Sequence, residues 1–236
     1  MTSAEPAIVG ATGETVWTIV VAGGSGNRFG RPKQYESLGV ERVLDRSVRV
    51  AAGASAGVVV VVPAGDVAGE SRACAADVVV AGGASRAASV RAGLDVVPDG
   101  ATVVCVHDAA RPFATPGLYS AVVDAVVAGA DGAIPGVVVT DTIKVVDAEG
   151  VVVSTPSRDA LRAVQTPQAF RAETLRRAHA SGRDGTDDAS LVEAIGGRVV
   201  VVPGEADNRK ITHPADLDWA RQVVAGQDRA ATGESG

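Results

Sequence analysis

A chain of 236 residues, 46% of them hydrophobic, is long enough to bury the core of one α/β domain. Its formal net charge of −6 argues against a general binder of nucleic acid or of membranes, because both surfaces repel an acidic protein. The first residues lack a cationic, apolar leader, and no apolar run approaches the ~18 residues of a membrane span. We therefore expect a cytoplasmic protein.

Short valine-rich runs alternate with stretches of helical spacing, a pattern that predicts a mostly parallel sheet covered by helices. The near-continuous valine indicates that the strands are buried on both faces. The expected strands lie at 16–22, 57–63, 77–81, 101–108, 132–139 and 198–203, and the expected helices at 86–97, 116–129, 187–197 and 213–226.

We expect one domain over residues 16–225, with disordered tails at 1–15 and 226–236, because both ends are small and polar. Residues 141–158 predict two short strands around an Asp-Ala-Glu-Gly turn. Because an isolated two-stranded ribbon is only marginally stable, this arm, at about 139–163, needs a covering surface. That surface is either the arm's own domain or a second subunit.

A glycine-rich loop follows the first expected strand, in the stretch VVAGGSGNRFGRPKQY at 20–35. The spacing of its glycines fits neither the GxGxxG dinucleotide loop nor the Walker A loop. Its bare amides can still wrap a phosphate chain, with Arg28 and Lys33 supplying positive charge. The alternative is a plain turn whose cations are solvated.

A second candidate is Asp108 in CVHDAARP, at the end of a valine-rich strand, where α/β proteins place their ligands. A carboxylate there can hold Mg²⁺ against phosphates, or else cap a helix. The third candidate is the stretch GGASRAAS at 82–89. Its glycines allow close backbone approach and Arg86 and Ser89 can read a ligand, although an ordinary strand-to-helix turn has the same pattern.

Seven motifs stand in order along the chain, and together they are far more specific than any one alone. They are AGGSGNR with PKQ (22–34), GGASR with Ser89 (82–89), HDAARP (107–112), DTIK (141–144), QTPQ (165–168), TDDAS (186–190) and NRKIT (208–212). In this order they resemble the 2-C-methyl-D-erythritol 4-phosphate cytidylyltransferases of the non-mevalonate isoprenoid pathway, nearly end to end. The chain departs from that pattern at Val21 and Gly23, where the family usually has Pro and Ala, and this form is more similar to the ribitol-5-phosphate cytidylyltransferases.

The resemblance implies a Rossmann-like, glycosyltransferase-A-like nucleotidyltransferase fold with a protruding β-arm. It implies transfer of CMP from CTP to a polyol phosphate, with Mg²⁺ or another divalent cation. It also implies a homodimer in which the arm of each subunit clasps the arm of the other.

The resemblance also implies a role for each candidate residue. Arg28, Lys33, Arg158 and Lys210 would be catalytic, the first two by gripping the triphosphate. Ala22, Gly23, Gly24, Ser25, Gly26, Gly83, Arg86 and Ser89 would bind the nucleotide, Thr166 and Thr186 with Arg158 and Lys210 would bind the acceptor phosphate, and Asp108, with Asp207 as a second candidate, would hold the metal.

Three alternatives stay open at this point. A ribitol-5-phosphate cytidylyltransferase would use the same donor site with another acceptor. A sugar-1-phosphate nucleotidyltransferase would share the glycine loop but accept UTP or dTTP. A non-catalytic nucleotide sensor would bind CTP without releasing pyrophosphate.

Overall fold

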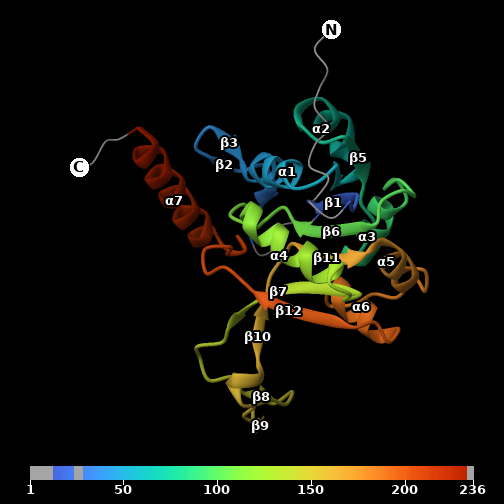
Figure 1. The fold of residues 1–236 in the computed structure, drawn as a ribbon. Helices are drawn as coiled ribbons and strands as arrows, with labels where there is room; N and C mark the ends of the chain where they lie inside the picture. The colour runs from blue at the N-terminus through green and yellow to red at the C-terminus, as the bar shows by residue number, and fades with distance from the viewer. Residues whose placement is uncertain (1–12, 24–28, 233–236) are drawn as a thin grey trace.

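The computed structural model describes residues 13–23 and 29–232 and is built around one eight-stranded sheet (Figure 1). The strand order is β10-β7-β11-β6-β1-β4-β5, and β12 also pairs with β7. Strands β1, β4, β5 and β6 pair in parallel, as do β7 and β12, whereas β10 and β11 are antiparallel to their neighbours. The strands are β1 (Val16–Val21), β4 (Gly57–Val62), β5 (Val78–Ala81), β6 (Val103–Asp108), β7 (Gly132–Val138), β10 (Arg162–Val164), β11 (Gln168–Arg171) and β12 (Val199–Pro203).

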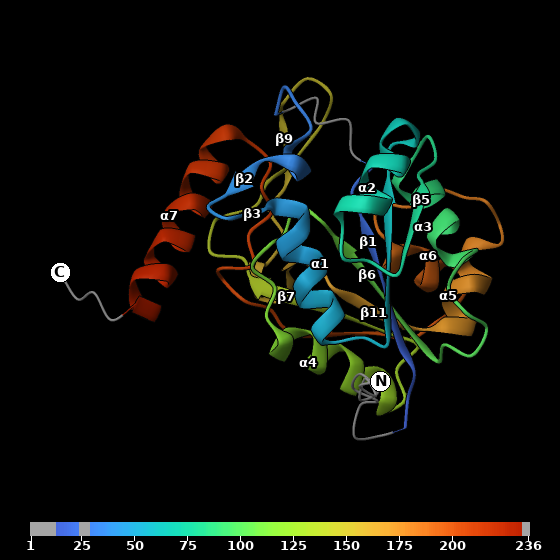
Figure 2. The same ribbon diagram turned by 90° about the horizontal axis from the view of Figure 1, so that it is seen from above.

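Helices cover both faces of this sheet, as the view from above shows (Figure 2). Helices α1 and α4 pack on one face, and α3, α5 and α6 pack on the other. The helices are α1 (Val43–Gly53), α2 (Val67–Ala73), α3 (Arg86–Leu94), α4 (Pro116–Val127), α5 (Ala172–His179), α6 (Asp188–Ala194) and α7 (Pro214–Thr232). The mostly parallel α/β sheet flanked by helices, predicted from the valine runs, is confirmed.

Strand β4 shows why the valine runs are continuous. Val58 and Val60 pack on the side of α1 and α4, and Val59 and Val61 pack on the side of α3. All four are fully buried. Burial of each valine side chain contributes roughly 1.5–3 kcal/mol, so both faces of the strand stabilise the fold.

Helix α7 closes a third, smaller core. Its Leu217 and Val224 pack against Phe29, Leu38 and Val43, which lie early in the chain. Leu38 belongs to a short hairpin of β2 (Ser37–Leu38) and β3 (Glu41–Arg42), which contacts α7. The C-terminal helix thus holds the segment that follows the glycine-rich loop.

The last helix is longer than the sequence predicts. Helix α7 continues to Thr232, whereas the disordered tail was expected to begin at 226. Residues such as Ala and Arg favour helix there, and the Arg46 guanidinium donates to Gln227 Oε1 at 2.6 Å. At the other end, residues 1–12 of the expected tail lie outside the described part of the chain.

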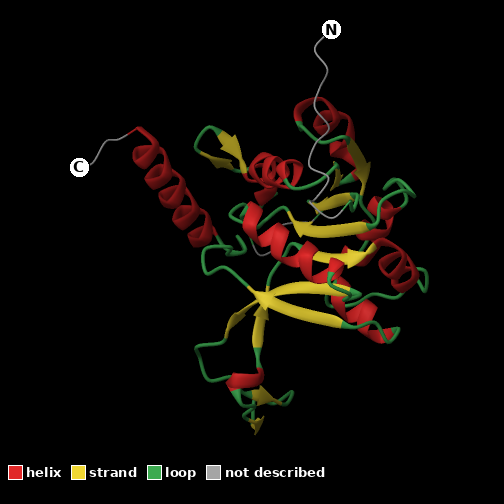
Figure 3. Ribbon diagram, in the orientation of Figure 1, coloured by secondary structure: helices red, strands yellow, loops and turns green. Residues whose placement is uncertain are grey.

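The arm projects from the sheet body beyond β7 and β12 (Figures 1 and 3). It carries the antiparallel strands β8 (Val145–Val146) and β9 (Val152–Ser154), as the sequence predicts. The turn between them closes with the Gly150 amide donating to the Asp147 carbonyl, and Gly150 has the positive φ of 82° that suits glycine. The valines of the arm, Val145, Val146, Val151, Val152 and Val153, are 47% to 65% exposed.

Candidate active site

Four parallel strands of the sheet end at one edge, and three of the predicted motifs meet there. The Ala22 amide, just after β1, donates to the Val61 carbonyl of β4 at 2.8 Å. The Gly82 amide, just after β5, donates to the Val62 carbonyl at 2.7 Å. Asp108 is the last residue of β6, which pairs with β1. In α/β folds ligands bind at this carboxyl edge of the sheet.

The turn from β5 into α3 is shaped by Ser89. Its hydroxyl donates to the Ser85 carbonyl at 2.9 Å and accepts from the Gly83 amide at 3.2 Å. A Cβ on Gly83 would lie 2.5 Å from the Cβ of Ala88, so only glycine lets the turn come this close to α3. Ser89 is buried. Because its two hydrogen bonds fix the turn, they hold the Gly83 backbone at the edge of the sheet.

Asp108 is the charged centre of the site. Its carboxylate accepts from Lys210 Nζ at 2.6 Å and from Arg86 Nε at 3.4 Å. Burial alone would raise the pKa of Asp108, but the Lys210 ammonium and the Arg86 guanidinium outweigh it and hold that pKa well below its usual range. The carboxylate is therefore ionised at every physiological pH.

An ion pair between the partly exposed Arg86 and the buried Asp188 extends from this centre toward α5 and α6. Arg86 Nη1 donates to Asp188 Oδ2 at 2.7 Å, and Asp188 Oδ1 lies 3.0 Å from His179 Nε2. The sequence reasoning missed Asp188, which stands 102 positions from Arg86, although it lies in the TDDAS motif. The motif itself is the signal that could have identified it.

Thr166 fixes the end of β6. Its hydroxyl oxygen accepts from the Asp108 amide at 3.0 Å and lies 3.1 Å from His107 Nδ1. His107 Nε2 lies 3.1 Å from the Arg111 carbonyl, which can only accept, so Nε2 carries the proton and Thr166 donates to Nδ1. Burial lowers the pKa of His107 to about 4, so the ring is neutral.

Four of the predicted loop residues, Gly24, Ser25, Gly26 and Arg28, lie outside the described residues. On the near side of that gap, a Cβ on Gly23 would lie 3.5 Å from Ser89 Oγ, an ordinary contact. On the far side, Lys33 begins the short helix η1 (Lys33–Tyr35) and is partly exposed.

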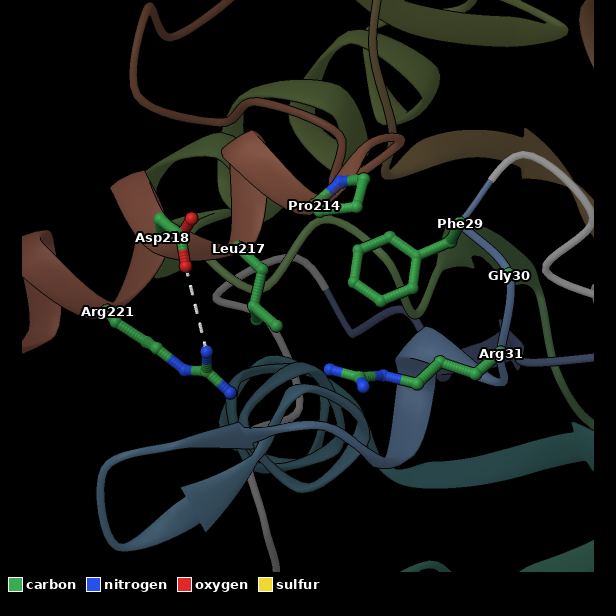
Figure 4. Close-up of a pocket in the computed structure, with 7 residues that line it drawn as sticks. All are labelled: Phe29, Gly30, Arg31, Pro214, Leu217, Asp218 and Arg221. Atoms are coloured by element: carbon green, nitrogen blue, oxygen red, sulfur yellow. Dashed lines mark ion pairs between the residues drawn. The ribbon is translucent and has the colours of Figure 1, made fainter.

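A pocket of about 290 Å³ opens between the far end of that loop and the start of α7 (Figure 4). Phe29 and Leu217 give it an apolar lining, and Arg31 and Arg221 extend into it from opposite walls. Both guanidiniums pair with the Glu36 carboxylate, at 2.5 Å for Arg31 Nε and 3.5 Å for Arg221 Nη2. The ion pair between Arg221 and Glu36 therefore connects α7 to the segment that contains Lys33.

The remaining predicted residues, Arg158, Thr186 and Asp207, are exposed. Arg158 is on the short helix η3 (Arg158–Ala160) in the arm, where its Nη1 donates to the Thr140 carbonyl at 2.7 Å. Thr186 precedes Asp187, the N-cap of α6, and Asp207 lies in the turn before Asn208. The structure thus brings together Gly83, Ser89, Arg86, Asp108, Thr166 and Lys210, but it does not bring Arg158 to them within one chain.

The site offers the carboxylate of Asp108, which suits a metal ion whose other ligands are substrate phosphates and water. Among the described residues, no three His, Cys, Asp or Glu side chains gather to hold an ion. Asp108 nevertheless offers an ionised carboxylate, and Mg²⁺ is often held by one or two carboxylates together with substrate phosphates and water.

Cys74 and Cys105 are both buried, and they form no disulfide in the structure. In the part of the chain that the structure describes, no helix is long and apolar enough to cross a membrane.

Comparison with known proteins gives one consistent result. A family model described as 2-C-methyl-D-erythritol 4-phosphate cytidylyltransferase matches residues 16–226. Relatives of that name from Rhodococcus jostii and Frankia casuarinae are 49% and 45% identical, over 89% and 91% of this chain and 95% and 83% of their own. The crystal structure of the Thermus thermophilus protein of that name superposes with a TM-score of 0.74 at 34% identity, covering 88% of this chain and 98% of its own.

Proposed function

Because the chain belongs to the 2-C-methyl-D-erythritol 4-phosphate cytidylyltransferase family, we infer that it transfers CMP from CTP to 2-C-methyl-D-erythritol 4-phosphate. The products are 4-diphosphocytidyl-2-C-methyl-D-erythritol and pyrophosphate. The observation that carries this conclusion is the family match over residues 16–226, which includes every described residue of the site. The ribitol-5-phosphate alternative is not favoured, since these relatives carry the methylerythritol name.

The reaction is a substitution at phosphorus. An oxygen of the acceptor's phosphate attacks the α-phosphorus of CTP, and the bond from that phosphorus to the β-phosphate oxygen breaks as pyrophosphate leaves. A phosphate monoester has a second pKa near 6, so the attacking group is mostly dianionic at neutral pH and needs no general base. The chain therefore has to align the two phosphates and stabilise the negative charge that develops between them.

Cations of the chain supply that stabilisation. We assign Lys33 and Arg28 to the triphosphate and Lys210 to the reacting phosphates. The side chain of Lys210 is 39% exposed, and it is oriented by its ion pair with Asp108 at the sheet edge. A cation held in place before reaction is more effective than one that must reorganise.

The β5–α3 turn suits the nucleoside. The backbone of Gly83 faces the same edge as Ala22 and Gly23, and the hydroxyl of Ser89 fixes its conformation. We assign these backbone groups, with Arg86, to recognition of cytidine. Thr186 is assigned to the acceptor's phosphate. Thr166 acts on the same site by fixing the Asp108 backbone.

We also assign a divalent cation, Mg²⁺ above all, to Asp108, with Asp207 as a second carboxylate. When bound, the metal would neutralise charge on the triphosphate. Asp108 would then exchange part of its pairing with Lys210 and Arg86 for the metal.

A homodimer accounts for the arm. Its exposed valines form an apolar surface that a second arm can cover, and such a contact would place Arg158 near the neighbouring subunit. We propose that Arg158 acts in the partner's site, since within its own chain it lies on η3 of the arm and donates to the Thr140 carbonyl there. We place the enzyme in the cytoplasm.

A pyrophosphate-release assay tests this function. CTP with 2-C-methyl-D-erythritol 4-phosphate should give rapid release, whereas CTP with ribitol 5-phosphate, or UTP with either acceptor, should give little. Excess chelator should abolish release, and Asp108→Asn should need more Mg²⁺. Binding of CTP without release of pyrophosphate would make the chain a sensor.

A further inference from the structure

The position of Lys33 depends on the position of the short helix η1, of which it is the first residue. This helix is a single turn, closed by the Tyr35 amide donating to the Pro32 carbonyl and the Glu36 amide donating to the Lys33 carbonyl, at 3.3 and 3.2 Å. One turn with two such bonds is not stable by itself. Contacts from elsewhere in the fold must therefore fix its position.

The hydroxyl of Tyr35 makes one such contact. It donates to Asp66 Oδ2 at 2.8 Å, in the short helix η2 (Ala64–Asp66) that follows β4. Burial and the Asp66 carboxylate raise the pKa of Tyr35 well above its usual value, so the hydroxyl remains a donor. Through this bond the turn of Lys33 is tied to the helical turn that follows β4.

The ring of Tyr35 makes a second contact. The Arg42 guanidinium lies 5.6 Å from the ring centroid, within the range of a cation–π interaction. Arg42 in turn pairs with Asp45 of α1 at 2.7 Å and with Glu70 of α2 at 2.8 Å. Ring and hydroxyl are thus held by groups that precede β4 in the chain, Arg42 with Asp45, and by groups that follow it, Asp66 and Glu70.

We propose that Tyr35 and Asp66 are positioning residues for the reaction, which hold Lys33 where negative charge develops on the transferred phosphate. This role rests on the proposed function of Lys33. Neither residue touches substrate, and each acts through the backbone of the Lys33 turn. Displacement of a catalytic group by about 1 Å can lower the rate roughly a hundredfold, so the hydrogen bond between them matters to turnover.

The first test compares two tyrosine variants. Tyr35→Phe keeps the ring and loses the bond to Asp66, and we expect kcat to fall about tenfold while the KM for CTP changes less than about twofold. Tyr119→Phe is the matched control, because Tyr119 is the other tyrosine of the chain and its buried hydroxyl has no hydrogen-bond partner among the described residues. Asp66→Ala removes the acceptor and should lower kcat like Tyr35→Phe, and it replaces that variant if Tyr35→Phe does not fold.

The second test separates positioning from general stability. If Tyr35 acts through Lys33, Tyr35→Phe should not lower kcat further in a Lys33→Ala background, whereas a general structural defect would multiply with it. Equal kcat for Tyr35→Phe and Tyr119→Phe, independent losses in the double variant, or full activity of Lys33→Ala would each overturn the proposal. Failure of the wild-type chain to release pyrophosphate would instead contradict the proposed function.

Discussion

The same amino acid behaves in opposite ways in the sheet body and in the arm. The valines of β4 have no exposed surface, whereas Val152 and Val153 of β9 are 53% and 65% exposed. In β4, neighbouring strands and helices on both faces exclude water from every side chain. The two-residue and three-residue strands of the arm pair with each other and form a separate sheet.

The difference shows that a valine run specifies a strand but not what covers it. The body satisfies its apolar side chains within one chain, and it also pairs the charges of its site internally. The arm leaves apolar surface that a second subunit can cover. A destabilising substitution in the body should therefore unfold the chain, whereas one in the arm should leave the chain folded and only dissociate the proposed homodimer.

The largest expected effect is the loss of the fold through a charge in β4. Val60→Asp buries a carboxylate without a partner and should cost more than about 5 kcal/mol of unfolding free energy. Val153→Asp, on the arm, should change the unfolding free energy of the isolated subunit by less than about 0.5 kcal/mol. Thermal melts give the stability of both variants, and light scattering should show Val153→Asp as a monomer. A dimeric Val153→Asp would contradict the arm interface.

The next largest effect separates the lysines of body and arm. A cation at about 4 Å in an effective dielectric of about 20 contributes roughly 4 kcal/mol, so Lys33→Ala should lower kcat about 10³-fold. Lys144, which donates to Thr155 within the arm, provides the control, and Lys144→Ala should lower kcat less than about twofold. Steady-state kinetics of both variants measure the contrast. Comparable losses would mean that the arm also stabilises the transition state.

A mixing experiment tests whether body and arm of different subunits share a site. Lys33→Ala and Arg158→Ala should each be nearly inactive as homodimers. After subunit exchange about half the dimers are mixed, and each has one site with an intact Lys33 and a borrowed Arg158, so about a quarter of wild-type activity should return. No recovery, in a mixture shown to have exchanged subunits, would assign Arg158 to its own chain.

The smallest effect concerns Gly23, a position where alanine is expected from the family resemblance. The added Cβ of Gly23→Ala would lie 3.5 Å from Ser89 Oγ, at ordinary contact distance, and Gly23 has no positive φ. We therefore expect kcat/KM to stay within about twofold of wild type with the same acceptor preference. A change of preferred acceptor would show that this position selects the substrate.

The sequence predicts the elements whose side chains are alike and misses those defined by tertiary pairing. Strand β4 was predicted within a residue because five valines follow Gly57. Strand β11, with the sequence QAFR, has no such run and is a strand because it pairs antiparallel with both β6 and β7. Helix α1 was missed although Leu44, Val48 and Ala51 have helical spacing and are buried.

The candidate site divides in the same way. Asp108 and Gly83 were predicted because a strand end and a glycine pair are local signals. The pairing of Arg86 with Asp188 and of Tyr35 with Asp66 joins residues 102 and 31 positions apart, and no local pattern identifies such partners. The role of Thr166 in fixing β6 depends on the orientation of His107, which only the fold determines.

The third core, between α7 and the segment from Phe29 to Val43, has a consequence for how the protein is made. A ribosome synthesises the residues of α7 long after the stretch that they cover. Until then Phe29, Leu38 and Val43 lack the apolar side chains of Leu217 and Val224, and the turn of Lys33 beside them lacks that support. The nascent chain can therefore pair the strands from β1 to β11 before α7 is made, but it completes this part of the catalytic edge only once α7 has been synthesised.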